Sequence, residues 1–263
     1  MKHHLYFLYA AIILAASCTS QRKLAYLNNL PESDSSVQFF SMEIPDYKIQ
    51  DRDVLYITLK AMNPEGTITD YLGGTGTSGS TTYIQGEGGG YLNGYNVNKD
   101  GNLLIPVLGL INVEGKTLME IRLMLQEEFN KRYKNAIVDC KLLSFKFTVI
   151  GEVRSPGTYV NYNNYLTVLE AIGRAGGIGD FGKRDHVLVV RPMNKGTKTF
   201  TLNLQDKSIL TSEAYFLLPN DVVIVEPQKQ KIFSMNLPTV SFIIGTFTST
   251  LTTTLLLINY FGK

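Results

Sequence analysis

The sequence predicts an α+β protein in which two small tandem hairpin–helix–strand domains precede a C-terminal transmembrane amphipathic helix. Two capping-box patterns predict the domains, because Thr117-Leu118-Met119-Glu120 and Thr167-Val168-Leu169-Glu170 each follow a turn signal and precede a strand-like run. The segment 238–261 predicts the final helix, since it is rich in Ile, Leu, Phe, Ser and Thr and carries no charge. We therefore expect a folded body joined to a membrane.

Residues 1–17 have the anatomy of a secretory signal peptide. A basic start at Lys2 precedes an apolar run over residues 5–16, which is too short to span a bilayer comfortably. Small residues then lead directly to Cys18, an order that resembles the bacterial lipobox. This resemblance implies a covalent lipid on Cys18, and no other cofactor is predicted. The alternative is an ordinary signal peptide with an incidental cysteine.

Charge and cysteine content argue against two classes of protein. Removal of Lys2 with the signal lowers the basic residues from 25 to 24, against 23 acidic residues. Nucleic-acid binding usually requires a strong basic excess, so we expect no nucleic-acid partner. If Cys18 is acylated, Cys140 has no partner for an intrachain disulfide, and we expect it to be a small buried apolar residue.

A lipidated N-terminal linker is expected over residues 18–44, and the first domain is expected over residues 45–144. Alternation over residues 54–59 predicts a strand. Residues 95–98 and 103–107 are predicted to be the two strands of a hairpin, because the Asp-Gly pair between them suits a tight turn. The proline near the end of the return strand favours an edge or a bulge.

A loop and a helix complete the first domain. The stretch 73–94 is rich in Gly, Ser and Thr, so it cannot bury enough apolar surface to form a core element. It is either a mobile surface loop or a loop that orders only against a neighbouring subunit or partner. The helix capped by Thr117 should bury one face and precede a strand at residues 137–143. That face consists of Leu118, Ile121, Leu125 and Phe129.

The second domain, expected over residues 145–228, repeats this plan. Strand-like residues 145–153 lead to the turn signal Ser155-Pro156-Gly157-Thr158. The helix capped by Thr167 should end at Ala175-Gly176-Gly177, which is typical of a helix C-terminus. A chance recurrence of common local motifs is the alternative to true modularity. Further strands are predicted at residues 187–191, 200–204 and 222–225.

The order of motifs along the body resembles one family of exporters. Asp53-Val54-Leu55, Asp100-Gly101, the Ile-Pro-Val-Leu-Gly run at 105–109 and Val113-x-Gly115-x-Thr117 resemble the polysaccharide export domain of outer-membrane capsule and exopolysaccharide export lipoproteins. Gly151-Glu152-Val153-x-x-Pro156-Gly157 and the runs 167–172, 175–178 and 218–225 resemble the soluble ligand-binding β-grasp domain of the same family. The resemblance covers roughly residues 45–228.

This resemblance implies an outer-membrane lipoprotein with a periplasmic body. Its copies would form a homo-oligomeric, octameric ring around a water-filled conduit for a polysaccharide substrate. The ring would meet an inner-membrane polysaccharide co-polymerase or export partner. Two turns depart from the family pattern: Gln50-Asp51-Arg52-Asp53 replaces Gly-Pro-Gly-Asp, and Pro219-Asn220-Asp221 replaces Pro-Gly-Asp. Asn tolerates left-handed backbone, whereas the conformation of the first turn is open.

The tail 238–261 is predicted to span a membrane as a helix, because about 22 residues reach roughly 33 Å. Pro238 suits its first turn. One stripe of this helix is apolar, and the opposite stripe is hydroxylic. The candidate pore-lining residues are Thr246, Ser249, Thr252 and Thr253, and the candidate lipid-facing residues are Ile243, Ile244, Phe247, Leu251, Leu255 and Ile258. The alternative is a single-pass anchor whose Ser and Thr side chains bond back to the helix backbone.

The sequence predicts neither a catalytic residue nor a metal site, because no nucleophile elbow, Walker loop or zinc-type spacing occurs in it. His186, the one histidine outside the signal, is expected at the surface. The acid pairs Asp51/Asp53 and Glu127/Glu128 are expected to be solvated. The rival functional interpretation is a lipid-anchored periplasmic module that binds a glycan or an envelope partner without forming a pore.

Overall fold

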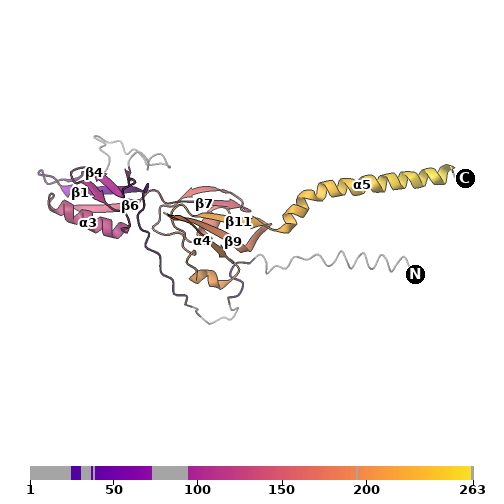
Figure 1. The fold of residues 1–263 in the computed structure, drawn as a ribbon, viewed down its shortest axis with the longest axis horizontal. Coiled ribbons are helices and arrows are strands. Elements are labelled where there is room, and N and C mark those ends of the chain that lie inside the picture. Colours follow the sequence, from indigo (N-terminus) through magenta and orange to yellow (C-terminus); the bar gives the residue numbers. More distant parts are fainter. Residues whose placement is uncertain (1–24, 31–36, 38, 73–93, 194, 262–263) are drawn as a thin grey trace.

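The computed structural model describes residues 25–30, 37, 39–72, 94–193 and 195–261. The predicted signal peptide, Cys18 and nearly all of the stretch 73–94 lie outside these residues. The described chain contains sheets, helices and a long C-terminal helix, so the α+β class is confirmed. In Figure 1 the second domain lies between the first domain and the C-terminal helix.

The first domain is organised around one central strand whose alternating residues are buried. Leu55, Ile57 and Leu59 are fully buried, because successive side chains of a strand point to opposite faces. The central strand makes antiparallel pairs with three others. These strands are β1 (Val54–Met62), at the centre, with β2 (Ile68–Asp70), β3 (Tyr95–Asn96) and β6 (Ile137–Leu142).

A separate two-stranded ribbon of the first domain corrects the predicted hairpin. The predicted turn exists, since the Gly101 N–H donates to the Asn98 carbonyl and Gly101 adopts a φ of 72°. However, β4 (Asn102–Ile105) pairs with β5 (Gly109–Asn112), and β3 pairs with β1 instead. The return strand therefore ends at Ile105 and not at Val107. Pro106 cannot donate to a ladder, and the Leu108 N–H closes a tight turn onto the Ile105 carbonyl at 3.2 Å.

Helix α3 (Leu118–Asn130) confirms the first capping box. The Thr117 hydroxyl accepts from the Glu120 N–H, and the Glu120 carboxylate accepts from the Thr117 N–H. The helix buries Ile121, Leu125 and Phe129, as its apolar periodicity predicted, whereas Leu118 is half-buried.

The second domain is a five-stranded sheet in the order β10-β9-β11-β7-β8. Helix α4 (Val168–Arg174) has the predicted capping box at Thr167, and Gly176 and Gly177 after it adopt positive φ values. A 3-10 helix, η2 (Lys207–Thr211), was not predicted. The strands are β7 (Lys146–Gly151), β8 (Gly157–Val160), β9 (Gly182–Met193), β10 (Gly196–Leu202) and β11 (Val222–Pro227).

Helix α5 (Lys229–Phe261) begins nine residues before the predicted start at Pro238. Pro238 therefore lies inside the helix and not in its first turn. A proline removes one backbone hydrogen bond and bends a helix, and the α5 ribbon changes direction near its beginning in Figure 1. The sequence from 229 to 237 contains no strong helix breaker, which explains the earlier start.

Candidate functional site

A tight turn precedes the central strand of the first domain. Arg52 adopts a left-handed φ of 67°, and the Asp53 N–H donates to the Gln50 carbonyl at 3.3 Å. The Asp53 carboxylate in turn accepts from the Gln50 N–H at 3.0 Å. The departure from the family pattern at this turn thus retains a tight turn, although Arg occupies a backbone region that glycine adopts more readily.

The same turn design precedes β11 in the second domain. Asn220 has a φ of 68°, and the Asp221 N–H donates to the Leu218 carbonyl at 3.1 Å. The Asp221 carboxylate accepts from the Leu218 N–H at 2.8 Å. Each domain therefore carries a left-handed residue and then an aspartate that caps its own turn. This correspondence was not predicted, although the dipeptide Asp-Val that closes each turn, at Asp53-Val54 and Asp221-Val222, is a signal that could have found it.

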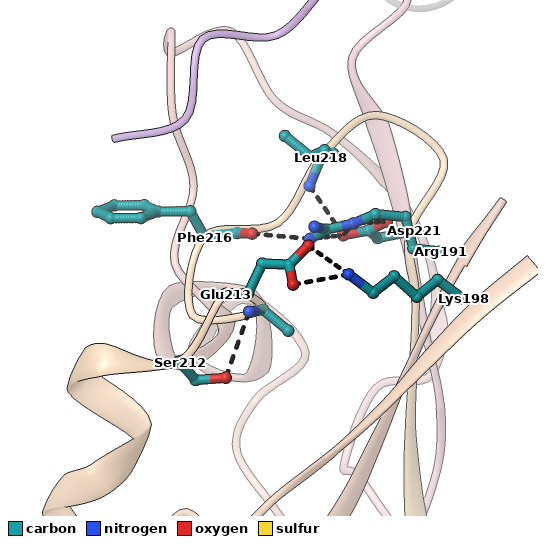
Figure 2. A network of polar contacts seen from close by, with 8 residues as sticks. Arg191, Lys198, Ser212, Glu213, Phe216, Leu218 and Asp221 are labelled. Atoms are coloured by element: carbon teal, nitrogen blue, oxygen red, sulfur yellow. Dashed lines mark hydrogen bonds and ion pairs between the residues drawn. The ribbon is translucent and has the colours of Figure 1, made fainter. Parts of the chain in front are cut away.

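Asp221 is neutralised by an arginine inside the second domain. Figure 2 shows the Arg191 guanidinium between the Asp221 carboxylate and the Phe216 carbonyl, with Nη2–O distances of 2.8 and 2.9 Å. The Arg191 Nε also donates to Asp221 Oδ1 at 3.0 Å, so the pair is bidentate. Burial raises the pKa of the Asp221 carboxyl, and the bonds from Arg191 and Leu218 oppose that rise.

Asp53 is buried without such a cation. Its carboxylate accepts from the hydroxyls of Tyr47 and Ser144, both at 2.8 Å, and in the part of the chain that the structure describes no basic side chain pairs with it. Burial is the largest cause that raises the pKa of Asp53. The expectation of a solvated Asp51/Asp53 pair was wrong, because Asp53 is only 4% exposed.

Ser144 ties this carboxylate to the junction of the two domains. It lies between β6 and β7, and its Oγ accepts from the Val54 N–H at 3.2 Å while donating to Asp53. A cavity of about 150 Å³ lies at the same junction, with walls from both domains. Sequence reasoning missed this cavity, since its walls come from segments far apart in the chain. They include Pro45, Tyr47, Phe145, Tyr165, Phe216 and Pro219.

One end of the second domain holds both segments that lead toward the predicted membrane attachments. The Leu27 N–H donates to the Leu204 carbonyl at 3.0 Å, and the Arg184 guanidinium lies 5.7 Å from the Tyr26 ring centroid. Next to Arg184, the Gly182 carbonyl accepts from the side chain of Gln228, the residue before α5, at 3.0 Å. The beginning of β9 therefore contacts both the N-terminal segment and the root of α5.

Helix α5 presents its hydroxyls and its apolar side chains on an exposed surface, and none of its residues is buried. It is also the one helix of the described chain that is long and apolar enough to cross a membrane. Thr246, Thr252 and Thr253 donate to carbonyls of the preceding turn at 2.7–3.0 Å. Thr248, Thr250 and Thr254 donate in the same way. The division into pore-lining and lipid-facing residues stays a prediction.

Groups that could carry out catalysis are dispersed. His186 lies at the surface, as predicted, with its Nε2 3.7 Å from Glu226 Oε1. Glu128 pairs with Lys131 at 2.7 Å on the outside of α3. Over the described ranges, no group of three His, Cys, Asp or Glu side chains could hold a metal ion. Cys140 is buried, as predicted, and burial raises the pKa of its thiol to about 12.

Comparisons with known proteins divide the chain at the same junction. The family model described as polysaccharide biosynthesis/export protein matches residues 42–143, and the SLBB domain model matches residues 145–225. Ser144 is the residue between them.

Two curated relatives are similar to this chain. The EPS I polysaccharide export outer membrane protein EpsA of Ralstonia solanacearum is 29% identical over 147 residues, which cover 53% of this chain and 38% of that protein. Its counterpart in Ralstonia nicotianae is 31% identical over 131 residues, covering 48% of this chain and 33% of that protein. The matches thus span well under half of the length of these relatives.

Proposed function

Because this chain belongs to the polysaccharide export family, we propose that it is an outer-membrane lipoprotein whose copies form a ring that conducts polysaccharide from periplasm to cell surface. The names of the two Ralstonia relatives support the polysaccharide substrate and the outer-membrane location. The family is one of transport proteins, so the chain itself carries out no reaction on the polymer in this proposal.

The observation that carries the proposal is the exposed α5 helix. Its 33 residues leave the second domain with none of their side chains buried, and an apolar helix of this length requires lipid or neighbouring helices around it. Its root is held to the body, since Lys231 pairs with Glu152 and the Gln228 side chain bonds to Gly182. The first turn of the helix is thus bonded to the second domain, whereas the rest of the helix needs lipid or neighbouring helices to cover its apolar side chains.

The end of β9 that holds the root of α5 also holds Tyr26. The proposed lipid attachment at Cys18 lies eight residues before Tyr26, a stretch that spans at most about 28 Å. Both membrane attachments would therefore leave the same end of the second domain. In this proposal the second domain would lie next to the outer membrane, and the first domain would lie farther into the periplasm, toward an inner-membrane partner.

In the ring, neighbouring α5 helices would form a shared wall with apolar side chains toward lipid. The hydroxyl arc of Thr246, Ser249, Thr252 and Thr253 would face the lumen. Because the threonine protons are donated to backbone carbonyls, the arc would offer mainly acceptor oxygens to the passing polymer. Such a surface can accept hydrogen bonds from sugar hydroxyls without a charge that would retain the chain.

The same back-bonds also suit the alternative, a lipid-anchored binding module with a simple single-pass helix. Extraction of the full chain in mild detergent, followed by native mass measurement and imaging, separates the two. A closed ring supports the conduit, and a stable monomer overturns it. Within assembled rings, cysteine at Thr246 or Ser249 should react with a water-soluble thiol reagent, whereas cysteine at Leu251 should not. Equal labelling of both faces would contradict the assignment of the lumen.

A further inference from the structure

The β4–β5 ribbon of the first domain is apolar on both faces. Leu103 and Ile105 point into the core and are fully buried. Leu104 and Leu110 are directly paired across the ribbon on its other face, and they are 67% and 66% exposed. A sheet with one solvated face normally alternates apolar and polar residues. The outer face of this ribbon therefore has the character of a surface that another molecule covers.

The tip of the ribbon extends the same apolar surface. Val107 is 62% exposed and adopts a φ of 72° in the turn that joins β4 to β5. A β-branched residue rarely takes this left-handed conformation, which turns of this type usually give to Gly or Asn. Solubility and local backbone preference thus both disfavour Val107 here, whereas a contact that covers its side chain would favour it.

A second apolar surface lies on helix α3. Met119 and Leu123 are one helical turn apart on the side opposite the buried residues, and both are more than half exposed. In Figure 1, α3 and β4 lie on opposite sides of the first domain. The two apolar surfaces are therefore separate, and one subunit cannot cover one of its own surfaces with the other.

The charges beside the two surfaces are complementary. Arg122 lies next to Met119, and its Nη2 is 2.9 Å from the Met119 sulfur. Glu114 lies at the base of the ribbon, close to Gly101. A Cβ added to Gly101 would fall 2.4 Å from the Cβ of Glu114. Within the described part of the chain, neither Arg122 nor Glu114 has an ion-pair partner within 4.0 Å.

From these four observations we infer that the ribbon of one subunit packs on the outer face of α3 in the next subunit. Leu104, Val107 and Leu110 would lie against Met119 and Leu123, with Glu114 near Arg122 at the margin. Two different surfaces joined head to tail generate a ring when the rotation closes. This inference rests on the proposed ring and deepens it, because it assigns the contact that connects neighbouring first domains.

Cross-linking between two differently tagged full-length chains tests this contact. One chain carries Leu110→Cys and the other Leu123→Cys, and mild oxidation or a short bis-maleimide should join them into mixed dimers within detergent-extracted rings. Cys140 contributes little background, since its thiol is buried. Leu110→Cys alone should give no dimer, and Ile68→Cys, on exposed β2, is the matched control that should not join Leu123→Cys.

The possible results separate the contact from the proposed function. Rings that form but give no mixed dimer overturn the contact and leave the conduit standing. Chains that never assemble overturn both.

A charge exchange gives a second test. Arg122→Glu should lower the assembled fraction at least several-fold, and adding Glu114→Arg should restore it. Unchanged assembly of Arg122→Glu, or no recovery in the double variant, would contradict the pairing of these two residues.

Discussion

The Ser144 hydroxyl donates a 2.8 Å hydrogen bond to the carboxylate of Asp53, which lies 91 positions earlier in the chain. This bond joins the turn before β1 to the connection between the two domains. The boundary between the two family matches falls on Ser144 itself. A buried carboxylate and a hydroxyl are therefore in direct contact at the junction, and measurable consequences follow from that contact.

Asp53 should make the protein less stable as pH rises, whereas most carboxylates of folded proteins have the opposite effect. Its folded-state pKa is raised by burial, so the neutral acid is favoured in the folded protein. The contribution of Asp53 to stability should be fully present below its unfolded pKa and be lost as pH rises through its folded pKa. Thermal unfolding of the wild type and of Asp53→Asn should be followed across this pH range. As pH rises, the melting temperature of the wild type should fall relative to that of the variant. A constant difference would contradict the raised pKa.

Ser144→Ala should destabilise the protein by about 1–3 kcal/mol, because it removes the hydrogen-bond partner of Asp53 Oδ1 and of the Val54 N–H, while Asp53 Oδ2 keeps its bonds from Tyr47 and Gln50. Denaturant unfolding of the full chain measures this loss. Thr199→Ala, on an exposed part of β10, is the matched control and should change stability by no more than about 0.5 kcal/mol.

Arg191→Met should be the more damaging change, with a loss of about 3–5 kcal/mol, because it leaves Asp221 charged and buried. The double variant with Asp221→Asn should recover part of this loss, since the amide can still accept from the Leu218 N–H. A double variant that is less stable than Arg191→Met alone would show that the charge of Asp221 is not the cause.

Gly151→Ala should destabilise the second domain by more than about 2 kcal/mol. Gly151 has a φ of 92°, and an added Cβ would lie 2.1 Å from the Val225 carbonyl oxygen, across the parallel β7–β11 pair. Gly173→Ala is the control, because it lies in α4 with nothing within 4 Å of the added Cβ. Replacing a helical glycine by alanine should stabilise the protein by up to about 1 kcal/mol. Thermal melts followed by circular dichroism distinguish the expected loss of stability in Gly151→Ala from the expected gain in Gly173→Ala.

Local features of this fold could be predicted from the sequence because their causes lie within a few residues. The capping boxes at Thr117 and Thr167 depend on side chains three positions apart. Asn220 takes its left-handed conformation because of its own side-chain chemistry. The apolar, uncharged composition of the tail likewise predicted a membrane-length helix, although not the earlier start of α5 at Lys229.

Long-range features were decided only by the tertiary structure. The ribbon partner of β4 was mispredicted, because strand pairing depends on which distant strand offers its edge and not on the turn alone. Asp53 was expected at the surface, since its burial depends on Tyr47 and Ser144 closing over it. The sequence by itself determined the two modules and the membrane-length tail, through local propensity and composition. Only the folded chain brought Tyr26 and Gln228 to the same end of β9, because the Tyr26–Arg184 and Gly182–Gln228 contacts join residues far apart in the sequence and leave no periodic trace in it.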